Sequence, residues 1–346
     1  MGNKIRVLVI DDSFLMRRVI SDIINSDQEL EVVGRAKDGI EALDMVLALS
    51  PDVVTLDVNL PLKDGILVLE DIMKKKPTRV IMLSAYTRTD ASATMRALEL
   101  GVVDFIAKPS GEISLGLDKL KSEIITKIKM AAKVDLDKYL ATFRPSSLAP
   151  VEEAKPVLIK KLVIIGASTG GPRAILDIMQ DMPLDLPAAF LIIQHMPKGF
   201  TLSFAERIAW NTGIRAKEAE EEDIIAPGRI FVAPAGFHMV LERDIEQVRI
   251  RLTDGPPVNF VRPSIDVTMF SATEIFGRDI IGVILTGMGK DGLDGAKRIK
   301  EKGGRIIVQD EETSVIWGMP KSIIKAGLAD EVLPISKISE AIIKYI

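Results

Sequence analysis

The sequence contains no cysteine and only two histidines, His195 and His238. The absence of cysteine excludes disulfides, a thiolate nucleophile and cysteine-based metal sites. No apolar stretch approaches the roughly 20 residues of a membrane-spanning helix. The first apolar run ends at Asp11 and Asp12, which does not fit a secretory signal. We therefore expect a cytoplasmic protein without a membrane span, and any imidazole base in its mechanism must be one of two residues.

Length and charge further limit the number of domains and the kinds of partner that we expect. The chain has 346 residues, more than one hydrophobic core usually holds, so we expect two domains. Its 45 basic and 49 acidic residues give a net charge of −4. Binding of nucleic acid without sequence preference requires a basic face. Nucleic acid is therefore not an expected partner, and a monomer is the expected oligomeric state.

The first 125 residues alternate short apolar runs with amphipathic helical patterns. Apolar runs without alternation are typical of buried parallel strands joined by right-handed helical crossovers. We predict a five-stranded parallel sheet whose functional site lies at the carboxyl ends of the strands. The predicted strands are residues 4–10, 31–36, 52–56, 79–84 and 103–107, and the helical patterns include residues 13–26, 39–49, 91–100 and 113–133.

The composition changes around residues 136–156, where Pro, Ser and Glu are frequent, as in linkers. A second α/β pattern begins at Lys161 and predicts a doubly wound, mostly parallel sheet. Its apolar runs are residues 162–165, 188–194, 229–232, 280–285 and 305–308. The predicted domains are residues 1–125 and 158–346, with a helical end and linker at 126–157.

Polar side chains follow the predicted strands of the first domain. Asp11 and Asp12 follow the first strand, Asp57 follows the third, Ser84 ends the fourth and Lys108 follows the fifth. The carboxyl ends of parallel strands share one edge, where three carboxylates require a cation. Mg²⁺ prefers such oxygen ligands. A carboxylate beside Mg²⁺, a hydroxyl and a lysine can accept a phosphoryl group, because the cations neutralise the transferring oxygens.

Together with Pro109, these residues resemble the receiver domain of two-component response regulators over about residues 3–125. The resemblance implies a flavodoxin-like fold and a phosphoryl group accepted by Asp57 from a histidine kinase. It also implies that Mg²⁺ is the cofactor of this step. The implied functional residues are the metal ligands Asp11, Asp12, Asp57 and the backbone carbonyl of Asn59, and the switch residues Ser84, Phe105 and Lys108.

The second domain opens with a glycine-rich segment around Ser168. Residues 166–172 read GASTGGP and contain G-x-S-x-G between a predicted strand and a helical pattern. Such a turn can expose a nucleophilic serine above a sheet. A phosphate-binding loop is the competing interpretation, but neither G-x-G-x-x-G nor a Lys-Ser or Lys-Thr pair is present. The pentapeptide alone leaves a nucleophile and a structural turn both open.

Two more candidates follow predicted strands. His195 comes directly after residues 188–194, and Asp291 lies in the segment TGMGKDG after residues 280–285. The three glycines of that segment suit a backbone that closely approaches a ligand. At one sheet edge, Ser168 can attack an acyl carbon, His195 can transfer its proton and Asp291 can hold the imidazole tautomer.

Backbone N–H groups near Thr169 and Met288 can stabilise the oxyanion of this reaction. The hydrolytic step then needs no cofactor. The second histidine, His238, lies within an apolar segment, residues 237–242, and we interpret it as an ordinary strand residue.

The three motifs of the second domain, behind a receiver, resemble the chemotaxis protein-glutamate methylesterase CheB family over nearly the whole chain. The resemblance implies a triad of Ser168, His195 and Asp291, with Met288 near the oxyanion. It further implies hydrolysis of glutamate γ-methyl esters on methyl-accepting chemotaxis receptors, with release of methanol, and deamidation of receptor glutamines. In such proteins the unphosphorylated receiver covers the active-site opening, so phosphorylation is expected to activate.

Three other functions remain as alternatives. A phosphorylation-dependent binding module would not depend on Ser168. A transcriptional regulator would need a basic recognition helix, which the acidic chain lacks. A dinucleotide-dependent enzyme would need the phosphate-binding glycine spacing. None of the three accounts for all the motifs together.

Overall fold

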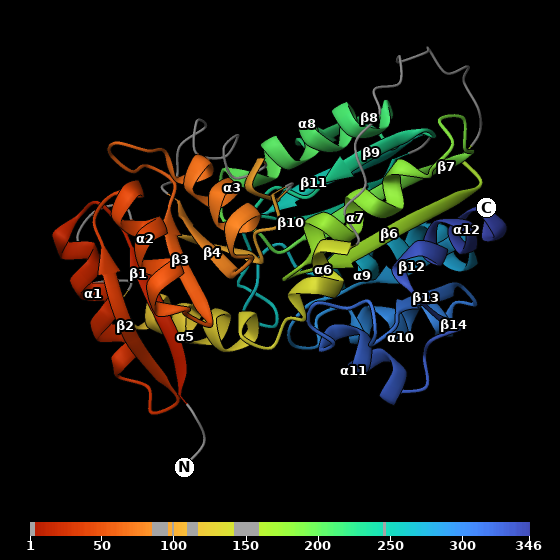
Figure 1. Cartoon of the computed structure of the whole chain (residues 1–346). Helices are drawn as coiled ribbons and strands as arrows, with labels where there is room; N and C mark the ends of the chain where they lie inside the picture. The colour runs from red at the N-terminus through yellow and green to blue at the C-terminus, as the bar shows by residue number, and fades with distance from the viewer. Residues whose placement is uncertain (1–3, 85–95, 99, 109–116, 142–158, 245–246) are drawn as a thin grey trace. The chain divides into compact units, whose positions relative to one another are not determined.

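The computed structural model describes residues 4–84, 96–98, 100–108, 117–141, 159–244 and 247–346 (Figure 1). The chain divides into two compact units, Met1–Phe143 and Arg144–Ile346. Each unit is described by itself. Within the described residues, no helix is long and apolar enough to cross a membrane.

The first unit, red to yellow in Figure 1, is built on a parallel sheet with the strand order β2-β1-β3-β4-β5. The strands are β1 (Ile5–Ile10), β2 (Leu30–Ala36), β3 (Val53–Asp57), β4 (Arg79–Ser84) and β5 (Asp104–Ala107). The helices are α1 (Phe14–Asn25), α2 (Gly39–Leu49), α3 (Gly65–Lys75), α5 (Leu117–Ala131) and α6 (Leu136–Ala141). Helix α1 packs against α5, and α2 packs against α3. All of β3 is buried, as expected for a central parallel strand.

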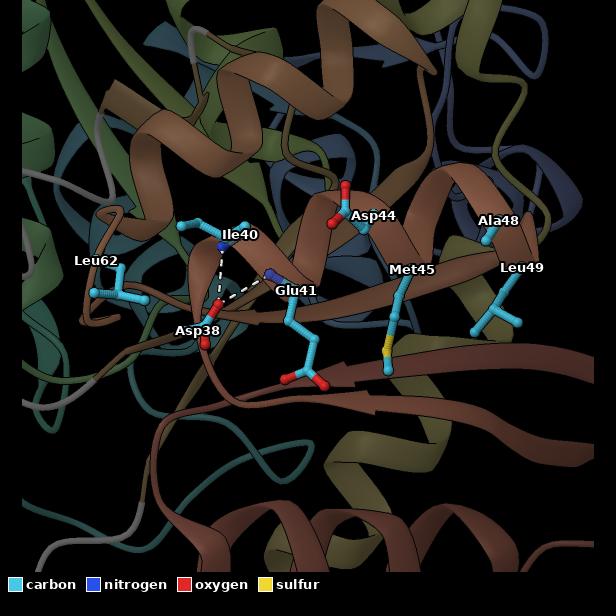
Figure 2. A pocket seen from close by; sticks show the side chains of 8 residues that line it. All are labelled: Asp38, Ile40, Glu41, Asp44, Met45, Ala48, Leu49 and Leu62. Atoms are coloured by element: carbon cyan, nitrogen blue, oxygen red, sulfur yellow. Dashed lines mark hydrogen bonds between the residues drawn. The ribbon is translucent and has the colours of Figure 1, made fainter.

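Side chains at the start of three helices satisfy free backbone N–H groups. Ser13 accepts a hydrogen bond from Met16 N at the start of α1, and Asp64 accepts one from Ile66 N at the start of α3. Asp38 accepts from two backbone N–H groups of α2, as Figure 2 shows. A pocket lies along α2, lined by that helix, its cap Asp38 and Leu62, and it contains none of the predicted site residues (Figure 2).

The second unit contains a seven-stranded parallel sheet with the order β14-β13-β12-β6-β7-β9-β8 and a two-stranded antiparallel hairpin, β10-β11. The strands are β6 (Lys161–Ala167), β7 (Ala188–Gln194), β8 (Arg215–Glu218), β9 (Arg229–Val232), β10 (His238–Arg243), β11 (Val248–Thr253), β12 (Ile280–Ile284), β13 (Arg305–Gln309) and β14 (Glu331–Leu333). The chain runs outward from β6 through β7 on one side and returns to β12 on the other. Parallel sheets bind ligands at such a change of direction.

Helices and the hairpin cover this sheet. The helices are α7 (Gly171–Gln180), α8 (Phe200–Thr212), α9 (Ile265–Phe276), α10 (Leu293–Glu301), α11 (Met319–Lys325), α12 (Ile335–Tyr345) and the short 3₁₀ helix η2 (Gly277–Asp279). Helix α7 packs against α8 and α12, whereas α9 packs against α10 and β10. The central strands β6, β7 and β12 are almost wholly buried, which explains their uninterrupted apolar sequences.

The predicted α/β class and both parallel sheets are confirmed. The predicted strands 79–84, 188–194 and 229–232 coincide with β4, β7 and β9. The predicted helix 91–100 falls mostly outside the described residues. The first six residues of the segment 136–156, interpreted as a linker, form α6, in which Leu136 is buried. The remainder of that segment lies outside the described residues.

Candidate functional site

Three carboxylates gather at the carboxyl edge of the first sheet. Oxygen atoms of Asp11, Asp12 and Asp57 lie within 4.8 Å of one another. The Lys108 Nζ atom lies 2.8 Å from Asp11 Oδ2 and 2.6 Å from Asp57 Oδ2. Asp11 Oδ2 is buried, and in the described residues its partner is the Lys108 ammonium. This set of oxygen donors fits a hard divalent cation such as Mg²⁺.

In this cluster, burial and neighbouring charges have opposite effects on the pKa values of Asp57 and Lys108. Burial raises the pKa of Asp57 to about 6, and the neighbouring Lys108 ammonium only partly offsets this effect. For Lys108, burial favours the neutral amine, but Asp57 and Asp11 outweigh it and raise the pKa of the ammonium. A further positive charge beside Asp57 would therefore stabilise its ionised form.

The other predicted residues of the first unit lie near this edge. The Asn59 N–H donates to Asp57 Oδ1 at 3.3 Å, which keeps the loop after β3 against the carboxylate. Ser84 is buried at the end of β4, and its carbonyl oxygen accepts a hydrogen bond from Lys108 N. Phe105 is buried in β5, where it pairs with Met82 of β4. Pro109 lies outside the described residues.

In the second unit, Ser168 lies between β6 and α7. Gly170 has a φ of 77°, and a Cβ there would lie 2.6 Å from Val315. A Cβ on Gly171 would lie 2.1 Å from Gln194 Oε1. The sharp turn and the tight packing therefore both require glycine, and they leave Ser168 only partly buried.

His195 and Asp291 come together from neighbouring loops. His195 follows β7, and its Nε2 atom lies 2.9 Å from Asp291 Oδ2 in the loop after β12. The His195 N–H donates to Ala167 O, and the Gln194 side-chain amide donates to the carbonyl oxygens of Ser168 and His195. The ends of β6 and β7 are thus tied together beside the His195–Asp291 pair.

Asp291 is buried, with 2% of its surface exposed, and accepts five hydrogen bonds. Besides His195 Nε2, the donors are Ile265 N (2.7 Å), Ser264 Oγ (2.7 Å), Asn259 Nδ2 (3.1 Å) and Asp266 N (3.3 Å). Burial alone would favour protonation, but the hydrogen bond and charge of His195, with the other donors, lower the pKa of Asp291 to about 2. The carboxylate is therefore ionised at neutral pH.

The backbone groups around Ser168 differ in their hydrogen-bond partners. Its N–H donates to Thr286 O, so this group is not available to an oxyanion. Thr169 is nearly buried, and its carbonyl oxygen accepts from Thr286 Oγ1. Met288 is about half exposed, and its N–H donates to no acceptor in the part of the chain that the structure describes. Over those same residues, Ser168 Oγ makes no hydrogen bond to His195; such bonds often tighten only when substrate binds.

Two family models match the chain. Residues 163–342 match the family model for the CheB methylesterase, and residues 7–117 match that for the response regulator receiver domain. The chain belongs to the CheB methylesterase family.

Relatives match the chain over nearly its full length. A protein from Pyrococcus horikoshii named protein-glutamate methylesterase/protein-glutamine glutaminase is 49% identical, over 100% of this chain and 95% of its own. A protein of the same name from Thermotoga maritima is 45% identical, over 99% of this chain and 98% of its own. The crystal structure of the Thermotoga maritima CheB methylesterase catalytic domain superposes with a TM-score of 0.53 at 45% identity, covering 54% of this chain and 98% of that one.

Several polar residues of this CheB site were missed by sequence reasoning. Asn259, Ser264 and Asp266 all contact Asp291, and Gln194 links the strand ends. Asn259, Ser264 and Asp266 follow no strand-end pattern, and their distance in sequence from Asp291 hides the contact. The one local signal is Ser264, a residue type that often begins a helix, directly before α9.

The glycines after β12 also have packing roles. The sequence predicts that they bring backbone N–H groups close to a ligand. In addition, a Cβ on Gly287 would lie 2.7 Å from Ser168 Cβ, and one on Gly292 would lie 2.7 Å from Ile284. Both glycines therefore serve packing within the CheB domain. Only Gly289, with a φ of 85° and no atom within 4 Å of a Cβ, leaves space beside it.

Both ring nitrogens of the second histidine, His238, face backbone groups. His238 Nδ1 accepts a hydrogen bond from Ser264 N, and its Nε2 lies 3.0 Å from Pro256 O. A neutral imidazole with its proton on Nε2 satisfies both contacts. This agrees with its interpretation as a strand residue, since His238 begins β10.

Proposed function

We propose that this protein hydrolyses glutamate γ-methyl esters on methyl-accepting chemotaxis receptors, releasing methanol, and deamidates receptor glutamines. The observation that carries the proposal is the ionised Asp291 bonded to His195 beside the Ser168 turn, in a chain of the CheB methylesterase family. Full-length relatives carry the name protein-glutamate methylesterase/protein-glutamine glutaminase. The proposed catalytic domain spans residues 158–346.

In the proposed mechanism, Ser168 Oγ attacks the acyl carbon of the glutamyl side chain. Because His195 Nε2 faces Asp291, the proton on Nε2 is held there and Nδ1 is the nitrogen that takes the proton of Ser168. The imidazolium then returns a proton to the departing methanol or ammonia. Water, activated by the same imidazole, attacks the acyl-serine and releases glutamate.

The negative charge on the acyl oxygen needs hydrogen-bond donors. The N–H of Met288 is proposed as one donor, because it donates to no acceptor in the described residues and lies on the loop that packs against Ser168. The backbone near Thr169 is proposed as the other. The Thr286 N–H donates to Gln309 Oε1, and its hydroxyl donates to Thr169 O. Thr286 thereby links the loop after β12 to the backbone at Thr169.

We propose that the receiver, residues 1–125, controls this activity, with residues 126–157 as helical end and linker. A chemotaxis histidine kinase would supply the phosphoryl group to Asp57. Asp11, Asp12 and Asp57, with the carbonyl of Asn59, would hold Mg²⁺, which neutralises the phosphoryl oxygens when bound. Lys108 adds a second positive charge, and Ser84 and Phe105 would relay the change. The protein is proposed to act as a monomer in the cytoplasm.

Methanol release from methylated chemoreceptor membranes tests the proposal. Intact protein and Ser168→Ala are compared, each with and without a small phosphoryl donor and Mg²⁺. Loss of the nucleophile is expected to lower turnover by at least roughly 10⁴-fold, and the donor is expected to raise release by the intact protein. Release that does not depend on Ser168 would contradict the triad and favour a phosphorylation-dependent binding module.

A further inference from the structure

The side-chain amide of Asn259 lies between two buried carboxylates. Its Nδ2 atom donates to Asp291 Oδ1 at 3.1 Å and to Asp266 Oδ2 at 2.8 Å. Each carboxylate has only 2% of its surface exposed. A primary amide carries two N–H groups, so one Asn side chain can donate to both acids at once.

The two carboxylates have different partners. Asp291 accepts from His195, whereas Asp266, in the first turn of α9, accepts from Gly295 N at 2.7 Å. Burial, with a contribution from the charge of Asp291, raises the pKa of Asp266 to about 7. The pKa of Asp291 is lowered to about 2. Near neutral pH the negative charge of the pair therefore stays mainly on Asp291, where an imidazolium can use it.

A tight turn aims the Asn259 side chain inward. Val258 and Val261 exchange two backbone hydrogen bonds, of 3.1 and 3.0 Å, around Asn259 and Phe260. Both central residues have positive φ, 51° and 66°, as in a type I′ turn. Asn tolerates this conformation better than most residues. Phe260, by contrast, is 98% exposed and takes no part in the contacts with Asp291.

We propose that Asn259 is a positioning residue of this hydrolase: its amide holds the Asp291 carboxylate in the orientation that His195 needs. The inference rests on the proposed function and extends it to a residue outside the triad. In the described structure Asn259 makes no hydrogen bond to Ser168 or His195, so its effect on the imidazole is exerted through Asp291.

The titratable groups around Asp291 come from four elements. His195 follows β7, Asp266 belongs to α9, and Asp294 in α10 adds negative charge near Asp266. His238 of β10 accepts a hydrogen bond from the N–H of Ser264, which in turn contacts Asp291 through its hydroxyl. A change at Asn259 thus alters the charge balance of a cluster that already holds several acids.

The test compares full-length Asn259→Gly, Asn259→Asp and Phe260→Gly with the wild type. Glycine keeps the positive φ of the turn and removes only the amide, whereas aspartate keeps the shape and replaces donors by a third carboxylate. We expect kcat for methanol release to fall by about 10- to 100-fold in both Asn259 variants, since small misplacements of catalytic groups have effects of this size. In Asn259→Gly, KM and the thermal midpoint should change little, and Phe260→Gly should keep wild-type kcat.

The pH profile separates positioning from a structural role. The added charge in Asn259→Asp favours the protonated imidazole of His195, so the acidic limb of kcat/KM should move to higher pH. The inference would be overturned if both Asn259 variants kept the wild-type kcat and the acidic limb of the kcat/KM profile of Asn259→Asp did not shift. A fall in kcat that follows only a loss of folded protein would overturn it as well. A wild type without Ser168-dependent methanol release would instead overturn the proposed function.

Discussion

His195 Nε2 and Asp291 Oδ2 lie 2.9 Å apart, although 96 residues separate them in the sequence. The contact fixes which imidazole nitrogen is left for Ser168. With its proton on Nε2, His195 presents the lone pair of Nδ1, the atom that the proposed mechanism uses as a base. The hydrogen bond therefore decides the tautomer as well as the orientation of the ring.

Replacing the carboxylate by an amide is expected to reverse this tautomer. In Asp291→Asn the amide nitrogen should face His195, because three donors surround the position of Oδ1 and only His195 and Ile265 N face Oδ2. His195 would then accept at Nε2 and carry its proton on Nδ1. Methanol release should fall by about 10⁴-fold in kcat, as expected when a triad acid is replaced by its amide.

Asp294→Asn is the matched control for that variant, since it removes the same charge from an exposed position three residues away in α10. Its kcat should stay close to that of the wild type. A comparable loss in both variants, or full activity in Asp291→Asn, would contradict the role of Asp291.

Asp266 should give the stability of the protein a pH dependence. Its folded pKa is raised from 3.8 to about 7, so its contribution is fully present below pH 3.8 and is lost as the pH rises through 7. The pKa of Asp291 is lowered to about 2, so its contribution is present above pH 3.8 and is lost as the pH falls through 2. Between pH 4 and 8, Asp266 is the member of the pair that titrates.

Denaturant unfolding between pH 4 and 8 can measure this effect. The free energy of unfolding of the wild type should fall as the pH rises, and it should fall less in Asp266→Asn. One pKa unit corresponds to about 1.4 kcal/mol, so the difference should be on the order of a few kcal/mol. Equal slopes for Asp266→Asn and the wild type would show that Asp266 stays ionised throughout.

The parallel sheets could be predicted from sequence because buried strands such as β7 carry only apolar residues until their last position. The edge strands β2 and β5 of the first sheet could be predicted too, but the edge strand β8 of the second sheet and the hairpin strand β11 could not. Strand β8 reads RAKE, and β11, VRIRLT, alternates polar and apolar residues as half-exposed strands do. Such strands form because neighbouring backbone groups pair with them, and a single sequence does not show this.

The candidate site divides in the same way. Ser168, His195 and Asp291 each follow a strong strand signal, and the sheet topology then gathers them at one edge. Asn259, Ser264 and Asp266 reach Asp291 across 32, 27 and 25 residues, through a tight turn and the start of α9. Nothing local in the sequence marks those three as neighbours of Asp291.

Gly170 should tolerate no side chain. A Cβ would combine a φ of 77° with a distance of 2.6 Å to Val315. Gly170→Ala is therefore expected to lower the free energy of unfolding by about 1–2 kcal/mol for the left-handed backbone and by about 1–3 kcal/mol more for overpacking. Gly327→Ala isolates the backbone effect, since its φ is 68° and no atom lies within 4 Å of a Cβ. Equal losses in both variants would show that Val315 moves aside without penalty.

Phosphorylation at Asp57 should couple the acidic cluster to methanol release. A small phosphoryl donor with Mg²⁺ is expected to raise release by the intact protein, because Asp57 lies beside Lys108 and the other two carboxylates. Chelation of Mg²⁺ should abolish the increase, since only Lys108 would then neutralise the phosphoryl oxygens. Asp57→Asn should keep the basal release and lose the increase, whereas Asp44→Asn, an equal charge change at an exposed position of α2, should keep both. An increase that survives in Asp57→Asn would mean that another group accepts the phosphoryl group or that the donor acts directly on the hydrolytic site.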